Sequence, residues 1–271
     1  MVHGLGKPEQ DYSAPLRKRI ERQRPDLAER LTWHSFVWYD LIAEREERLW
    51  HKLLNNSQLK EHRLRRLVLT VLATATSYQS GHRSEHGLYQ TIQSHLISQL
   101  TEIEARHGDV PIFLIGHSFG VLVLCNYIWD WQHFNLIDKH STPLVRLENT
   151  IGFASLASPL PIFQLSNRNA AAIRFPHPRV RDFFPRSMEW TELRRRVRWD
   201  NYFTPGDVLA YPLRELSDSY AENVNEDIAV GVSSFLPWQP MSHLYYWSSN
   251  NVAEHVTEQI SGALDALELR R

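Results

Sequence analysis

A serine inside the pentapeptide GHSFG (116–120) is the first feature of this sequence that could carry chemistry. The apolar run PIFLI precedes it and the apolar run VLVLC follows it, which predicts a strand, a sharp turn and a helix. Such a turn lifts the serine clear of the sheet edge, and it needs small flanking residues because the two backbones nearly touch. Gly116 and Gly120 meet this need, so Ser118 is a candidate nucleophile; the alternative is a serine that caps a buried helix.

The elements that must position this serine alternate between strand and helix along the chain. Strands are predicted by short apolar or alternating runs at 35–42, 112–115, 149–155, 197–203 and 228–232. Helices are predicted by helical spacing of apolar residues at 16–20, 27–31, 49–54, 63–75, 88–103, 121–129 and 252–267. The last helix is expected to be capped by Asn250 or Asn251. This alternation predicts an α/β fold with a mainly parallel sheet and helices on both faces.

Length and composition predict one globular domain spanning residues 1–271. Hydrophobic residues make up 42% and charged residues 23%, and the formal net charge is −1, so nothing favours a nucleic-acid partner. No apolar run approaches the ~20 residues of a membrane span, and the N-terminus lacks the pattern of a signal peptide. We therefore expect a cytoplasmic protein without a membrane span. Within the domain, the proline-bearing stretch 159–190 is a candidate cap or lid, or else a long surface connection.

The elbow pattern resembles that of the α/β-hydrolase superfamily, and specifically its esterases and lipases. The resemblance extends from an HG element at residue 3 to the C-terminal helix and is specific at three short motifs. It implies the α/β-hydrolase fold and a nucleophile, acid and base in the order Ser, Asp or Glu, then His.

The base implied by this resemblance lies on a loop between the last strand and the final helix. His243, in PMSHLYYW, occupies that place, so we expect it to take the proton from Ser118. His255 falls within the final helix, and His140 and His177 precede the expected acid and break the order.

The acid is expected after the penultimate strand, where a carboxylate could fix the tautomer of the base. Asp207, in TPGDVLAYPL, lies on a Pro-Gly turn at that place, and the segment resembles its counterpart in esterase-like hydrolases. The alternative is an aspartate that merely forms the turn. Its rivals are three other acidic residues, Asp200, Glu226 and Asp227.

An acyl-transfer site also needs donors aimed at the developing oxyanion. One expected donor is the backbone N–H of Phe119, directly after the serine. HGLG (3–6) resembles the HG element of lipases and esterases, which implies a second donor at Leu5. That element normally follows a strand, and here Met1 and Val2 alone precede it, so the N-terminal strands are expected to be reduced or missing. Either the chain is a short natural version, or its start lies upstream.

Other signals predict no cofactor and no metal. HRSEH (82–86) has the spacing of a zinc motif, but Gly81 and Gly87 bracket it, so a pair of histidines in a loop or at a helix start is the better interpretation. The chain lacks the glycine-rich phosphate-binding motifs. The four tryptophans of the C-terminal half could line a substrate pocket, although core packing is the commoner role of this residue; they are Trp190, Trp199, Trp238 and Trp247.

These observations predict a serine hydrolase that acts on a small-molecule carboxylic ester through an acyl-enzyme. Short soluble esters are favoured because 159–190 contains no long apolar lid helix. The same residues would also serve lipase, thioesterase or acyltransferase chemistry. The alternative from another class is a non-catalytic hydrolase-like domain that binds a ligand or a protein.

Overall fold

A computed structural model describes residues 1–9, 11–55, 60, 62–80, 87–134, 141–164, 170–231 and 239–269. Among these residues, one sheet contains the strands β1 (Ile112–His117), β2 (Thr150–Leu156), β3 (Trp199–Phe203) and β4 (Glu226–Ala229). The strands lie in the order β1-β2-β3-β4, and each neighbouring pair is parallel. This arrangement confirms the predicted α/β class with a parallel sheet.

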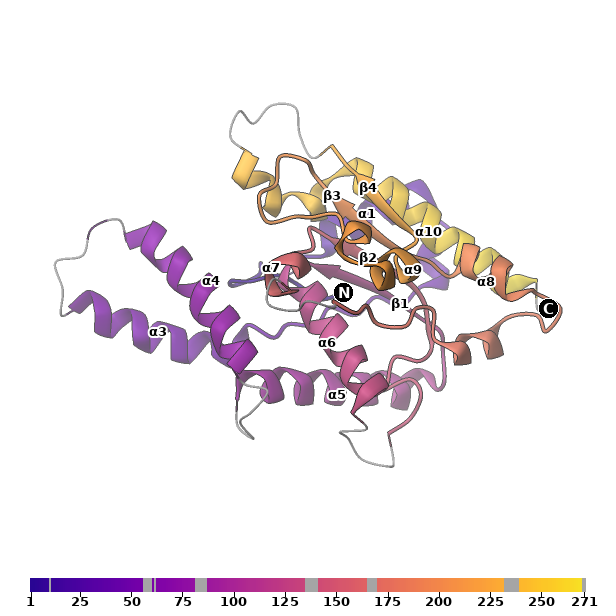
Figure 1. Cartoon of the computed structure of the whole chain (residues 1–271), viewed down its shortest axis with the longest axis horizontal. Helices are drawn as coiled ribbons and strands as arrows, with labels where there is room; N and C mark the ends of the chain where they lie inside the picture. The colour runs from indigo at the N-terminus through magenta and orange to yellow at the C-terminus, as the bar shows by residue number, and fades with distance from the viewer. Residues whose placement is uncertain are drawn as a thin grey trace.

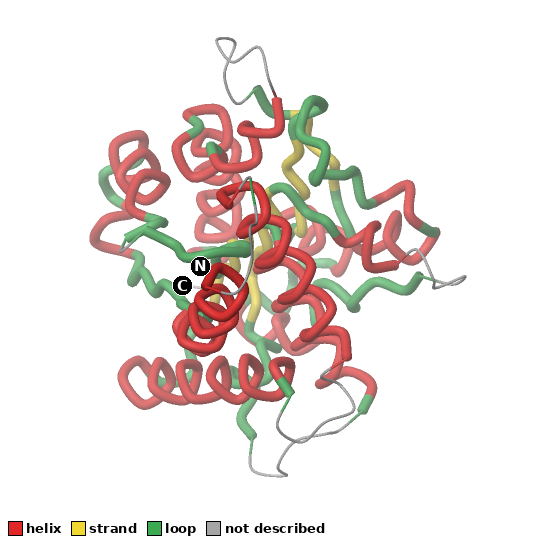
Figure 2. The backbone as a smooth tube through the Cα atoms, turned by 90° about the vertical axis from the view of Figure 1, so that its left-hand side faces the viewer, coloured by secondary structure: helices red, strands yellow, loops and turns green. Residues whose placement is uncertain are grey.

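Helices connect the strands and enclose the sheet (Figure 2). The α-helices are α1 (Ala14–Gln23), α2 (Leu27–Arg30), α3 (Asp40–Asn55), α4 (His62–Ser80), α5 (Leu88–His107), α6 (Phe119–His133), α7 (Leu160–Gln164), α8 (Trp190–Arg196), α9 (Asp218–Asn223) and α10 (Asn250–Glu268). Short 3-10 turns lie at η2 (Pro178–Phe183), η3 (Arg214–Leu216), η4 (Gln239–Leu244) and η5 (Tyr246–Ser248). Figure 1 shows α3 and α4 extending as a pair to the left, away from the sheet.

Two apolar cores cover the two faces of the sheet, with α5 and α6 on one side and α1 and α10 on the other (Figure 1). Successive residues of a strand point to opposite faces, so neighbours in β2 enter different cores. Phe153 packs in the core of α5 and α6, whereas Ala154 packs in the core of α1 and α10. All seven residues of β2 are buried, as expected for an inner strand covered on both faces.

The N-terminus extends the sheet beyond β1 by single residues rather than by full strands. Val2 forms parallel bridges to both Phe36 and Gly116, and its N–H donates to the carbonyl of Ile115 at 2.9 Å. Among the described residues, the segments before β1 thus join the sheet through isolated bridges. The predicted strand at 35–42 is wrong beyond Phe36, because the chain turns there and α3 begins at Asp40.

The cap of the last helix also differs from the prediction. Ser249, rather than Asn250 or Asn251, is the N-cap of α10: its backbone is extended and its hydroxyl oxygen accepts from the N–H of Val252 at 3.2 Å. Asn250 is instead the first helical residue, and its side chain accepts from Arg19 of α1 at 2.9 Å. The helix thus starts one residue earlier than an asparagine cap would allow.

Glycine at position 120 is required by the close approach of α6 to the N-terminal residues. A Cβ on Gly120 would lie 2.4 Å from the carbonyl oxygen of Val2, whereas a Cβ on Gly262, in α10, would meet nothing within 4 Å. Both glycines are helical, so alanine improves helix propensity equally at either place. We expect Gly120→Ala to lower the free energy of unfolding by about 1–3 kcal/mol and Gly262→Ala to raise it by up to about 1 kcal/mol.

Urea unfolding of the two variants beside the wild-type protein measures both changes. The difference between the two variants measures the effect of the contact between residue 120 and Val2. Equal stabilisation of both variants would contradict the close approach of α6 to Val2.

Candidate functional site

Ser118 lies at the junction of β1 and α6 with its backbone in a rarely populated conformation. Its φ is 52° and its ψ is −122°, which costs about 1–3 kcal/mol for a residue with a side chain. The junction is held by the Ser118 N–H, which donates to the carbonyl of Leu156 at the end of β2 at 2.8 Å. Gly116 allows the close packing, since a Cβ there would lie 3.1 Å from the main chain of Val121. The predicted strand–turn–helix elbow is therefore present.

Ser118, His243 and Asp207 form a continuous chain of hydrogen bonds. The Nε2 atom of His243 lies 2.7 Å from the Ser118 Oγ, and its Nδ1 atom lies 2.8 Å from Oδ2 of Asp207. An ionised carboxylate can only accept, so Nδ1 carries the proton and Nε2 is free to accept from the serine hydroxyl. The structure thus brings together three residues that are separated by up to 125 positions in the sequence.

Asp207 is held by the turn that follows β3. Its side chain is fully buried, and Oδ1 accepts from the N–H of Leu209 at 3.0 Å while Oδ2 faces His243. The Asp207 N–H donates to the carbonyl of Thr204 at 2.9 Å, which closes the turn. Asp207 therefore both stabilises the turn and accepts a hydrogen bond from His243.

His243 lies on η4, between β4 and α10, which is the place expected for it. Its side chain is 12% exposed, so the ring is largely shielded while remaining accessible from one side. The loop is tied to the Asp207 turn because the Tyr246 hydroxyl accepts from the N–H of Thr204 at 2.8 Å. His243 and Asp207 are thus carried by two loops that contact each other.

The HG element lies directly against the elbow. A Cβ on Gly4 would lie 2.9 Å from the Cβ of Ser118, so only a glycine fits there without a shift of its neighbour. Leu5 follows at once and is partly buried against the core that contains Phe119. Phe119 begins α6, and the first N–H groups of a helix have no acceptor within it. The two expected oxyanion donors therefore belong to segments that meet at Ser118.

His3 fixes the HG element and was missed by sequence reasoning, which used the motif only to locate Leu5. The N–H of Trp38 donates to Nε2 of His3 at 3.2 Å, so the proton lies on Nδ1, which donates to the carbonyl of Gly4 at 2.7 Å. The indole N–H of Trp38 also donates to the carbonyl of His3 at 3.1 Å, and the two rings stack. Burial lowers the pKa of His3 to about 4, so the His3 ring is uncharged at neutral pH.

The rival acids and bases are engaged elsewhere. Asp200 pairs with Arg198 at 2.9 Å, and Arg198 also pairs with Glu226 at 2.8 Å. Asp227 accepts from the main-chain N–H groups of Leu213 and Arg214, each at 2.8 Å.

The other described histidines considered as bases also face partners other than Ser118. His255 lies 3.8 Å from Glu258 on α10, and His177 lies 4.0 Å from Glu148. His140 lies outside the described residues.

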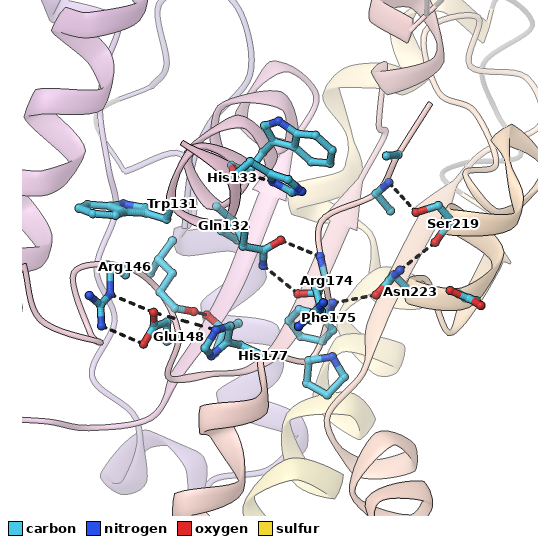
Figure 3. A pocket seen from close by; sticks show the side chains of 18 of the residues that line it. Trp131, Gln132, His133, Arg146, Glu148, Arg174, Phe175, His177, Ser219 and Asn223 are labelled. Atoms are coloured by element: carbon cyan, nitrogen blue, oxygen red, sulfur yellow. Dashed lines mark hydrogen bonds and ion pairs between the residues drawn. The ribbon is translucent and has the colours of Figure 1, made fainter. Parts of the chain in front are cut away.

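A cavity of about 640 Å³ lies at the other end of the sheet, beside the start of β2 and the C-terminal half of α6 (Figure 3). Several of its polar side chains pair with each other or with the main chain. Arg146 pairs with Glu148 at 2.9 Å, and Gln132 both accepts from the N–H of Arg174 at 2.8 Å and donates to its carbonyl at 3.0 Å. On the opposite wall, Asn223 of α9 accepts from the N–H of Phe175 at 2.8 Å. These contacts hold Arg174 and Phe175 between α6 and α9.

The remaining part of the predicted cap segment approaches the elbow through α7. The ring of Phe163 lies 6.2 Å from that of Phe119. Residues 165–169 lie outside the described residues, and a cap formed by 159–190 stays a prediction.

The three tryptophans of the C-terminal half that the structure describes lie in different places. Trp199 is a buried core residue whose ring stacks on Phe153 at 5.2 Å. Trp190 lines the remote cavity, whereas the ring of Trp247 lies 5.7 Å from that of His117 and thus close to the site. Trp238 lies outside the described residues.

Among the described residues, no three His, Cys, Asp or Glu side chains converge as a metal site would require, and no helix combines the length and apolar character needed to cross a membrane. The motif HRSEH (82–86) falls outside the residues that the structure describes. No protein-family model, curated protein or solved structure matches this chain.

Two buried histidines at the site make stability depend on pH. Burial lowers the pKa of His117 to about 3 and that of His3 to about 4, from an ordinary value of 6.5. Between about pH 4 and pH 6.5 the unfolded chain therefore binds more protons than the folded chain, so the free energy of unfolding falls as the pH falls through this window. Each histidine contributes up to about 1 kcal/mol per pH unit there.

Urea unfolding at about pH 7 and about pH 5 tests this expectation. His117→Gln should show a shallower loss of stability with acid than the wild-type protein, whatever its stability at neutral pH. An unchanged slope would mean that His117 is not held uncharged by burial.

Proposed function

We propose that this chain is a serine hydrolase of the α/β-hydrolase superfamily that cleaves carboxylic esters through an acyl-enzyme. One observation carries the proposal: Ser118, His243 and the buried Asp207 are joined by hydrogen bonds of 2.7 and 2.8 Å at the end of a parallel sheet. The parallel sheet and the elbow support the superfamily, because the nucleophile follows a strand and opens a helix.

In the proposed reaction, Ser118 Oγ attacks the carbonyl carbon of the ester while Nε2 of His243 takes its proton. The negative charge moves to the carbonyl oxygen, where the N–H groups of Phe119 and Leu5 stabilise it. The intermediate then collapses: the bond to the alcohol breaks, His243 returns the proton to the departing oxygen, and the acyl group stays on Ser118.

Hydrolysis of the acyl-enzyme repeats the same steps with water. His243 takes a proton from water as its oxygen attacks the acyl carbon, and it then returns the proton to Ser118 as the carboxylic acid leaves. Asp207 holds the ring in one tautomer and stabilises the imidazolium that forms twice in the cycle. Because the Asp207 side chain is fully buried, its charge acts on His243 with little screening by water.

A fluorophosphonate probe tests the nucleophile and separates an enzyme from a non-catalytic binding domain. We expect covalent labelling of the wild-type protein, no labelling of Ser118→Ala, and unchanged labelling of Ser248→Ala, because Ser248 bonds only to a main-chain carbonyl nearby. A folded wild-type protein that is not labelled by the probe would contradict the proposed enzyme and favour a non-catalytic binding domain.

Kinetics on p-nitrophenyl esters of increasing acyl length test the acid and the substrate class. Asp207→Asn should lower kcat by about 10⁴-fold, since the amide no longer fixes the reactive tautomer. Asp200→Asn, at another buried aspartate, should retain kcat in its folded fraction because Asp200 pairs with Arg198 and not with His243. Equal losses in both variants would contradict the assignment, and the acyl-length profile separates esterase from lipase behaviour.

A further inference from the structure

His117 is the last residue of β1 and immediately precedes the serine of the elbow. Its side chain is buried, and its Nε2 atom lies 2.8 Å from the main-chain carbonyl oxygen of His243. A carbonyl oxygen only accepts, so Nε2 carries the proton and donates. The hydrogen bond thus joins the strand that presents Ser118 directly to the main chain of the residue whose ring faces Ser118.

Both partners of this hydrogen bond are held in place. The His117 main-chain N–H donates to the carbonyl of Val2 at 3.0 Å, which fixes the strand end. Around its ring lie those of His243 at 5.1 Å and of Tyr246 and Trp247, both at 5.7 Å. The hydrogen bond is therefore enclosed by aromatic rings, where a donor without an acceptor would be costly.

A histidine at this place supplies a donor without adding a charge beside the base. Burial lowers the pKa of His117 to about 3, and the neighbouring His243 acts in the same direction. A permanent cation 5 Å from the His243 ring would oppose formation of the imidazolium that the reaction requires. The titratable groups that act on His117 are His243, Asp207 and His3, and the uncharged ring disturbs none of them electrostatically.

We infer that His117 is a positioning residue: its Nε2–H holds the main chain of His243 where the His243 ring bridges Ser118 and Asp207. This inference rests on the proposed function. A small displacement of a general base lowers the rate far more than it lowers substrate binding, because the base acts only in the chemical steps. His117 does not touch the reacting atoms and acts through His243.

The test compares two substitutions that separate the donor from the ring. His117→Phe keeps an aromatic ring but removes the donor, whereas His117→Gln keeps an N–H donor near the place of Nε2 and removes the ring. We expect His117→Phe to lower kcat by about 10- to 100-fold with KM changed by less than about 3-fold, and His117→Gln to recover most of that loss. The control is His255→Phe, on the outer part of α10, with kcat unchanged.

Three results would overturn the inference. They are full activity of His117→Phe, an equal loss of kcat in His117→Phe and His117→Gln, and a fall in kcat/KM that comes from a raised KM with kcat unchanged. If the wild-type protein is labelled by the fluorophosphonate probe and one of these results is seen, the inference fails while the proposed function stands. A wild-type protein that is not labelled fails the proposed function and the inference together.

A nitrogen-15 NMR spectrum of the wild-type histidines tests the same hydrogen bond without any activity. We expect the His117 ring at neutral pH to carry its proton on Nε2, in slow exchange with water. Because it uses the wild-type protein, this measurement tests the hydrogen bond even if His117→Phe does not fold. A ring with its proton on Nδ1 would overturn the inference.

Discussion

The close approach of three backbone segments at Ser118 is the constraint on which the rest of the site depends. The end of β1, the start of α6 and the N-terminal HG element meet at glycines, and a Cβ on Gly4 or Gly120 would lie within 3 Å of a neighbour. At this meeting point Ser118 has a positive φ, and its hydroxyl faces the His243 ring. The strain is tolerated because hydrogen bonds from Val2 and to Leu156 fix both sides of the turn.

A parallel sheet brings the other groups to the same edge. The loops after β3 and β4 leave the sheet on the side where β1 ends, which is the side where Asp207 and His243 meet Ser118. Contacts between these loops then set the geometry: Tyr246 braces the Asp207 turn, and His117 braces the His243 loop. Under our proposal, catalysis depends on these uncharged braces as well as on the three reacting groups.

The convergence of Ser118, Asp207 and His243 could be predicted from sequence, because the elbow follows strong local rules and the resemblance to esterases and lipases implies where the other two residues lie. Small residues around Ser118, a Pro-Gly turn at Asp207 and a loop before the final helix at His243 are visible without coordinates. The predictions failed where a tertiary contact overrides local preference. Residues 35–42 are rich in strand formers, yet Trp38 turns inward to donate to His3 and the chain becomes helical at Asp40.

The positioning residues were beyond sequence reasoning for the same reason. His3 and His117 are two of fourteen histidines, and no sequence pattern indicates their distant partners, Trp38 and His243. His117 finds its acceptor 126 residues away, on the main chain of His243. Likewise, Ser249 rather than the neighbouring asparagines caps α10. N-cap preference alone does not locate a helix start to within one residue.

The central claim is that Ser118 becomes acylated, and trapping the acyl group tests it most directly. The wild-type protein is mixed with a p-nitrophenyl ester, quenched in acid within the first turnover, digested with trypsin and examined by mass spectrometry. We expect the tryptic peptide 107–139 to gain the mass of the acyl group, with fragmentation placing it on Ser118. An ester that is hydrolysed while the acyl group is found on another residue, or on none, would contradict the account.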